Sequence, residues 1–259
     1  MTTAASTLEI LIKRDRLCVL AGVAAATILA WVYLISMAAG MDMIADAMLS
    51  ARATHWAPTD FVLMFLMWAI MMVGMMLPSA PLMILLFTVV NRRRLSRGKA
   101  VTPPMVFAAG YIAVWSAFSL GATFLQWGLH RAGVLSPIMT TTSALMGGVT
   151  LVFAGIYQWI PLKTSCLRHC LSPLHFISTH WRNGSRGVFF MGWTHGLYCL
   201  GCCWVLMCLL CVGGVMNLPW IAGLAIFVLI GKVWHHRWVS RLSGVALIVW
   251  GASVAAGGF

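Results

Sequence analysis

The chain has 259 residues, of which 61% are hydrophobic and 8% are charged, and its formal net charge is +12. Its mean hydropathy is +0.93, whereas about 25% of the residues in an average soluble domain are charged. A water-soluble fold of this size could not bury so many apolar side chains and still keep a polar surface. Soluble globular, disordered and disulfide-scaffold classes are therefore excluded, and we expect one membrane domain over residues 1–259, embedded in a lipid bilayer.

Seven apolar segments are long enough, or nearly so, to cross about 30 Å of hydrocarbon. An open sheet would leave backbone groups unsatisfied in lipid, so the sequence predicts an all-α, polytopic bundle of transmembrane helices. The predicted spans are Leu17–Ala39, Asp60–Val90, Pro104–Leu129, Ser143–Ile160, Val188–Val215, Leu218–Gly231 and Leu242–Gly257. The sixth segment is short enough to be a half-span.

The basic residues between the spans predict the orientation. With the N-terminus in the cytoplasm, all Lys and Arg residues except Arg52 and Arg131 fall on the inner side. The positive-inside rule thus favours seven crossings, with the N-terminus inside and the C-terminus outside. In this topology, residues 1–16 are a cytoplasmic segment and residues 161–187 are a basic cytoplasmic loop that contains Cys and His.

The fifth predicted span has the densest group of metal-ligating side chains. At about 100° per residue, Cys199 lies about 40° around the helix from His195, and Cys202 lies about 20° to the other side. Cys203 follows on the side of Cys199. An imidazole and thiols at these spacings can converge on one ion, and they suit Cu(I), Zn or iron. The alternative is that the cysteines are small packing residues of a membrane helix.

The second predicted span has two rows of methionines at helical spacing: Met71 with Met75, and Met72 with Met76. Thioethers select soft metals such as Cu(I), although Met also fills gaps between helices. Pro78 and Pro81 follow, and we expect them to kink the helix and free backbone carbonyls. A shared site would require the second and fifth spans to face each other.

The predicted cytoplasmic loop adds Cys166 and Cys170, four residues apart, with His169 between them. These thiols could bind a metal or form a redox pair, and the nearby Lys163 and Arg168 favour thiolate. An inert reduced pair is the alternative.

Several functional classes lack support in the sequence. No Asp or Glu lies within a predicted span except at the outer start of the second, which disfavours proton-coupled transport. No nucleotide-binding motif and no Ser-His-Asp set is present, so catalytic residues remain unassigned and a non-enzymatic role is favoured. No nucleic-acid partner is expected.

Three stretches together resemble a bacterial family of predicted metal-binding integral membrane proteins. They are Trp68–Pro78, Tyr157–Lys163 with Cys166 and Cys170, and Gly196–Met207 with residues 214–218 after it. The resemblance covers about residues 60–235 and implies a metal site in the membrane. Its matching positions are Cys166, Cys170, His195, Cys199, Cys202 and Cys203, and more weakly Met71, Met72, Met75 and Met76. Family members tend to have a Glu before the Lys that follows the sixth span, where this chain has Gly231 and Lys232.

These observations lead to one preferred function and two alternatives. We expect a protein of the bacterial inner membrane that binds a soft metal, with copper preferred to zinc, between the second and fifth spans. It would store, deliver or insert the metal, or serve as an accessory to a larger membrane metalloenzyme complex. The alternatives are a membrane thiol–disulfide oxidoreductase that uses Cys199 and Cys202, and a small structural subunit of a membrane complex.

Overall fold

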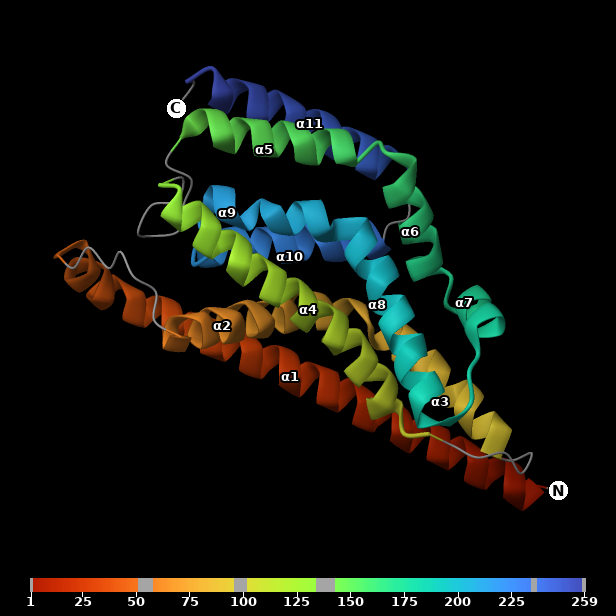
Figure 1. The fold of residues 1–259 in the computed structure, drawn as a ribbon. Helices are drawn as coiled ribbons and strands as arrows, with labels where there is room; N and C mark the ends of the chain where they lie inside the picture. Colours follow the sequence, from red (N-terminus) through yellow and green to blue (C-terminus); the bar gives the residue numbers. More distant parts are fainter. Residues whose placement is uncertain (1, 51–57, 96–101, 134–142, 234–236, 258–259) are drawn as a thin grey trace.

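The computed structural model describes residues 2–50, 58–95, 102–133, 143–233 and 237–257, and all regular secondary structure in these ranges is helical (Figure 1). This confirms the all-α fold class. The elements are α1 (Thr2–Ser50), α2 (Pro58–Met76), the 3-10 turn η1 (Leu77–Ser79), α3 (Pro81–Leu95), α4 (Pro104–Arg131), α5 (Ala144–Tyr157), α6 (Pro161–Leu171), α7 (Pro173–His180), α8 (Gly184–Cys208), α9 (Leu210–Gly213), α10 (Leu218–Val233) and α11 (Arg237–Ala255).

Within the described ranges, five helical stretches are long and apolar enough to cross a membrane: Lys13–Gly40, Pro58–Ser79, Pro104–Arg131, Gly184–Gly213 and Trp238–Ala255. A sixth is present if α5 and α6, which are bent by 63°, form one broken span. The helix α10 is apolar but has only 16 residues. Seven crossings would require counting both the bent pair and α10, so the number seven and the orientation stay predictions.

The second predicted span is broken where the two prolines stand, as the sequence indicated. The helix α2 ends at Met76, and α3 begins at Pro81, which has no backbone N–H to donate. Between them, the Ala80 N–H donates to the Leu77 carbonyl at 3.0 Å. In an α-helix it would donate to the Met76 carbonyl instead. The Met76 carbonyl therefore lacks the Ala80 donor of a continuous α-helix, and it accepts from the hydroxyls of Ser79 and Tyr111.

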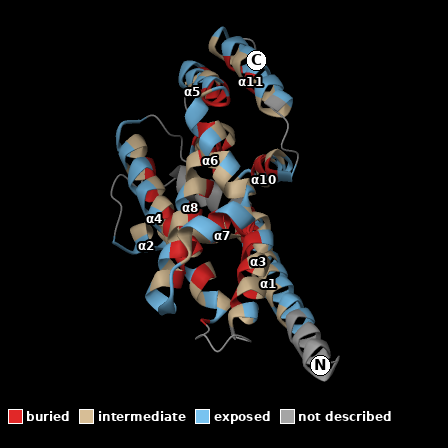
Figure 2. Ribbon diagram, turned by 90° about the vertical axis from the view of Figure 1, so that its right-hand side faces the viewer, coloured by how far each residue is buried: buried red, intermediate tan, exposed pale blue. Residues whose placement is uncertain are grey.

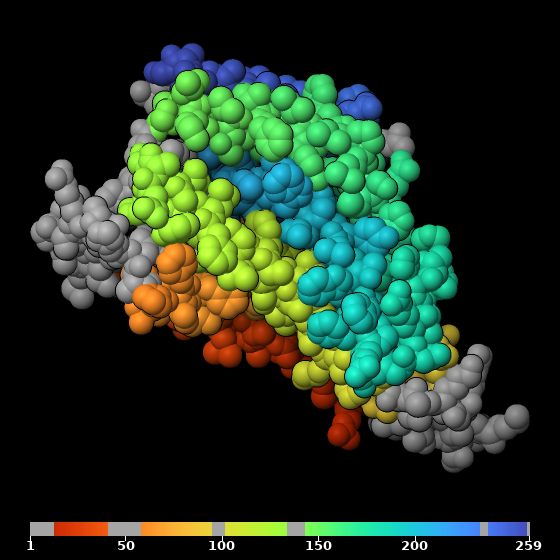
Figure 3. Space-filling view, in the orientation of Figure 1, coloured from red at the N-terminus to blue at the C-terminus, as the bar shows by residue number. Residues whose placement is uncertain are grey.

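Residues 161–187 contain two short helices, where the sequence suggested a loop between spans. Both α6 and α7 begin with a proline, whose missing N–H is harmless in the first turn of a helix. The helix α6 then packs along α8 (Figure 3). The cysteines of this segment are thereby brought against the fifth predicted span.

Glycines let two pairs of helices approach closely. The helix α4 packs against α8, where an added Cβ at Gly192 would overlap the Phe107 carbonyl and one at Gly110 would overlap the Phe189 carbonyl. The helices α5 and α11 form a second pair, in which Gly148 and Gly251 face each other. Small residues at helix contacts are typical of membrane proteins, in which van der Waals packing drives association.

The best-buried part of the molecule lies where α2, α3, α4 and α8 meet (Figure 2). The helix α1 lies along α2 and α3, and Arg92 of α3 donates to both carboxylate oxygens of Asp15 in α1, at 2.5 and 2.9 Å. These bonds raise the pKa of Arg92 above its usual value. Only 11% of the apolar window in Lys13–Gly40 of α1, and 11% of that in Trp238–Ala255 of α11, is buried, as expected of helices that face lipid.

Replacing Gly192 with alanine should destabilise the bundle, because the added Cβ would push α8 away from the Phe107 carbonyl. Overpacking of this kind costs about 1–3 kcal/mol. The matched control is Gly223→Ala in α10, where an added Cβ meets no atom within 4 Å. That change should be neutral, or stabilising by up to about 1 kcal/mol. Thermal unfolding of detergent-purified protein measures both, and equal losses of stability would contradict the α4–α8 contact.

Candidate metal-handling site

Five of the eight cysteines gather from two helices. The helix α6 supplies Cys166 and Cys170, and α8 supplies Cys199, Cys202 and Cys203. The Cys170 thiol lies close enough to the thiols of Cys199 and Cys202 for their charges to influence one another. Cys166 lies against the backbone of α8, since an added Cβ at Gly201 would be 2.8 Å from its Sγ. We call these five residues the thiol cluster.

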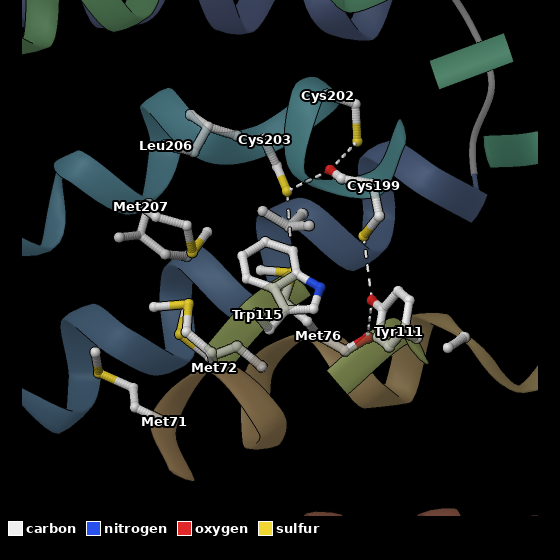
Figure 4. Close-up of a cluster of buried hydrophobic side chains, with 14 of the residues drawn as sticks. Met71, Met72, Met76, Tyr111, Trp115, Cys199, Cys202, Cys203, Leu206 and Met207 are labelled. Carbon is white, nitrogen blue, oxygen red and sulfur yellow. Dashed lines mark hydrogen bonds between the residues drawn. The ribbon is translucent and has the colours of Figure 1, made fainter. Parts of the chain in front are cut away.

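The three α8 members of the thiol cluster are buried, and two of them donate to the backbone carbonyl of the third. The thiols of Cys202 and Cys203 each donate to the Cys199 carbonyl at 3.0 Å (Figure 4). The bonds run three and four residues back along the helix, so the side chains gather on one side of it. The stripe of thiols predicted for this helix therefore points into the protein interior.

The methionine rows of α2 meet the thiol cluster at Met76. Its Sδ is 4.0 Å from the Cys203 Sγ. Met71, Met72 and Met75 are also buried, with at most 3% of each side chain exposed. Figure 4 shows that Met71, Met72 and Met76 lie in one buried cluster with the α8 cysteines. The second and fifth predicted spans therefore contact each other through sulfur.

The Cys199 thiol is part of a closed ring of polar contacts. The Lys232 ammonium donates to the Cys199 Sγ at 3.0 Å and to the Ser79 hydroxyl at 2.7 Å. Ser79 in turn donates to the Met76 carbonyl at 2.7 Å, and the Tyr111 hydroxyl donates to the same oxygen at 3.1 Å. The Tyr111 oxygen also lies 3.1 Å from the Cys199 Sγ and closes the ring.

His195 is buried beside the thiol cluster, in an aromatic cage. The centroid of its ring lies 6.0 Å from that of Phe107, 5.7 Å from Tyr111 and 5.6 Å from Phe176. Its Nδ1 has no hydrogen-bond partner among the described residues. A buried, unpaired ring nitrogen is costly unless another group satisfies it. His195 thus has an unpaired ring nitrogen, and its ring packs on Tyr111, whose hydroxyl contacts the Cys199 thiol.

The described residues hold no ready set of three Cys, His, Asp or Glu side chains around one point. A tetrahedral zinc site of the structural type requires four such ligands. Soft thiolates and thioethers select Cu(I), which is satisfied by fewer ligands. Thiol and thioether sulfur atoms, as present here, are ligand types that soft metals such as Cu(I) accept.

Sequence reasoning missed four side chains of this region: Ser79, Tyr111, Met207 and Lys232. Met207 extends the row of Cys199 and Cys203 by one turn of α8, so helical spacing could have revealed it. Lys232 was assigned to the cytoplasmic side, yet only 8% of it is exposed. A Lys within the last turn of an apolar helix was the available signal. Nothing in the sequence pointed to Tyr111 or Ser79.

Mild oxidation should join Cys170 to Cys199 or Cys202 within one chain, because these thiols interact in the folded protein. Peptide mass spectrometry after alkylation of the remaining thiols would identify the product. Cys170→Ser should abolish it, whereas Cys18→Ser, which removes an exposed thiol on α1, should leave it unchanged. If the α8 cysteines are never linked to Cys170, the placement of α6 is wrong.

No curated protein and no solved structure matches this chain. A protein-family model described as PpoB2, copper chaperone, matches residues 65–254. This range includes both methionine rows, the thiol cluster, His195 and Lys232, so copper handling fits the sulfur-rich centre. The chain belongs to the PpoB2 copper chaperone family.

Proposed function

We propose that this copper chaperone works within the bacterial inner membrane, where it holds Cu(I) on the thiol cluster and passes it to a membrane metalloenzyme. The observation that carries the proposal is the contact of the Cys203 thiol of α8 with the Met76 thioether of α2, next to the other cysteines that α6 and α8 bring together. Copper is cargo in this proposal, bound and released by exchange of sulfur ligands.

Cys199 and Cys202 are the proposed primary ligands. Both interact with Cys170, so a third thiol is at hand when one bond to the ion breaks. Cys203 lies one turn beyond Cys199 and contacts Met76. The His195 Nδ1 is available as a further donor. An ion with several neighbouring donors can move by exchanging one ligand at a time, which suits a protein that must release its cargo.

The methionines supply a route away from the thiol cluster. Thioethers are neutral, soft ligands that suit Cu(I) without burying a further charge. From Met76 the row continues along α2 to Met72, toward the end of the helix that the topology prediction places outside. We therefore assign delivery to the outer side of the membrane, with a membrane metalloenzyme as the acceptor.

Purified, reduced protein should bind about one Cu(I) per chain, and the double variant Cys199→Ser, Cys202→Ser should lose it. Its Cu(I) affinity should fall by at least about 100-fold, since even second-shell changes cost 10- to 100-fold. The measurement is elemental analysis under anaerobic conditions, with competition against a Cu(I) chelator. Cys208→Ser is the matched control, because Cys208 ends the same helix and lies outside the thiol cluster.

Counting free thiols on the same sample separates the alternatives. Full copper occupancy in the double variant would rule out the assigned ligands. A wild-type protein without metal but with one disulfide would favour the oxidoreductase, which Cys170 beside Cys199 and Cys202 could support. A metal-free protein with all thiols reduced would favour the structural subunit.

Met76→Leu should leave the bound copper at about one per chain but slow its transfer to an external acceptor. Met-to-Leu exchange nearly conserves volume and costs less than about 1.5 kcal/mol, so the fold should persist while the thioether is lost. The measurement is the rate at which loaded protein passes Cu(I) to a membrane-impermeant chelator. Met105→Leu, at an exposed methionine of α4, is the control. An unchanged transfer rate in Met76→Leu would contradict the relay.

A further inference from the structure

A small cavity of about 30 Å³ lies beside the thiol cluster, between α6, α8, α10 and α11. Cys202 and Cys203 form one part of its wall. The other polar lining residues are Lys163, Lys232, Ser240 and Ser243, and the rest of the wall is mainly apolar. A cavity of this volume admits one or two small groups, such as the sulfur end of a thiol, rather than a large ligand.

Two lysines line this cavity, and only 8% of each is exposed. Lys163 Nζ is 3.5 Å from the Ser240 hydroxyl, and Lys232 contacts Ser79 and Cys199. Among the described side chains, no carboxylate pairs with either lysine. Buried ammonium groups are costly unless an anion lies nearby, above all within a membrane.

The positive charge of the two lysines favours some chemical forms of copper over others at this cavity. A bare Cu(I) ion is a cation, which two ammonium groups would repel. Cu(I) held by two thiolates has a net charge of −1, and the same ammonium groups would attract it. The sulfur end of such a complex would meet Cys202 and Cys203 in the wall of the cavity.

We propose that the cavity is the entry site for an anionic Cu(I)–thiolate complex. Lys163 and Lys232 act as counter-ions for the complex that arrives, and afterwards for the Cu(I)–thiolate complex that the protein's own cysteines form. This inference rests on the proposed copper-carrying function and adds the substrate class. The positive-inside prediction places α6 and the start of α11 on the cytoplasmic side, so small cytoplasmic thiols would be the carriers.

The exchange balances without an oxidant. A thiol of the cavity wall forms a Cu–S bond, and one carrier thiolate departs with the thiol proton. A second thiol of the cluster then repeats the step, so two Cu–S bonds break, two form, and two neutral carrier thiols leave. Copper stays Cu(I) throughout, and the complex has a charge of −1 before and after.

The test compares two carriers of similar size and opposite charge, with full-length protein in lipid nanodiscs under anaerobic conditions. The carriers are Cu(I) bound to 2-mercaptoethanesulfonate and Cu(I) bound to cysteamine. Loading is followed by copper analysis of protein separated at timed intervals. Wild-type protein should load faster from the anionic sulfonate complex, because charge complementarity raises association rates by about tenfold or more.

The decisive variant is Lys163→Met, which lines the cavity but does not contact Cys199. It should reduce loading from the sulfonate complex by about tenfold, with little change for the cysteamine complex and the same final stoichiometry. Lys163→Arg should restore the preference. Arg168→Gln removes a charge from an exposed position of the same helix and should change neither rate.

The outcomes separate this inference from the proposed function. If wild-type protein takes up no Cu(I) from either carrier, the proposed function itself fails. Full loading at equal rates from both carriers would overturn the entry site and leave copper binding intact. A loss that is equal for both carriers in Lys163→Met would show that this lysine has a packing role, and would overturn the inference as well.

Discussion

The proline break between α2 and α3 is the constraint on which the sulfur-rich centre depends. Because the Ala80 N–H bonds to the Leu77 carbonyl, the Met76 carbonyl loses the donor that a continuous α-helix would give it. Tyr111 and Ser79 both donate to this oxygen, and each also reaches a group at the thiol cluster. In an unbroken helix the Ala80 N–H would share this oxygen with the two hydroxyls.

The polar contacts at the break also link three helices that are distant in sequence. Tyr111 joins α4 to α8 through Cys199, and Ser79 joins η1 to α10 through Lys232. In the apolar interior such contacts are strong, and an unmade one is costly. The polar ring therefore holds the thiols of α8 at a set distance from the thioethers of α2. Close packing of α4 on α8 at Gly110 and Gly192 supports the same geometry.

The charged side chains buried near the thiol cluster are lysines. The described residues of the bundle interior contain two buried lysines but no carboxylate paired with them. Proton relays in membranes depend on intramembrane carboxylates, whereas a copper ion bound by two thiolates is itself an anion. Sulfur ligands suit copper, the metal named in the description of the PpoB2 copper chaperone family.

The sequence by itself determined the helical class, most of the apolar helices and the break at the prolines, and it proposed the Cys, His and Met residues of the candidate site. Hydropathy and helical spacing are local properties, so they predicted that the thiols of Cys199 and Cys203 share a side of one helix. Only the tertiary structure decided that Cys166 and Cys170 fold back onto α8, that Met76 contacts Cys203, and that Lys232 is buried against Cys199. These contacts join residues between 29 and 127 positions apart. Such pairings depend on how the helices pack. Glycine contacts and buried polar bonds decide this packing, and no local sequence pattern records it.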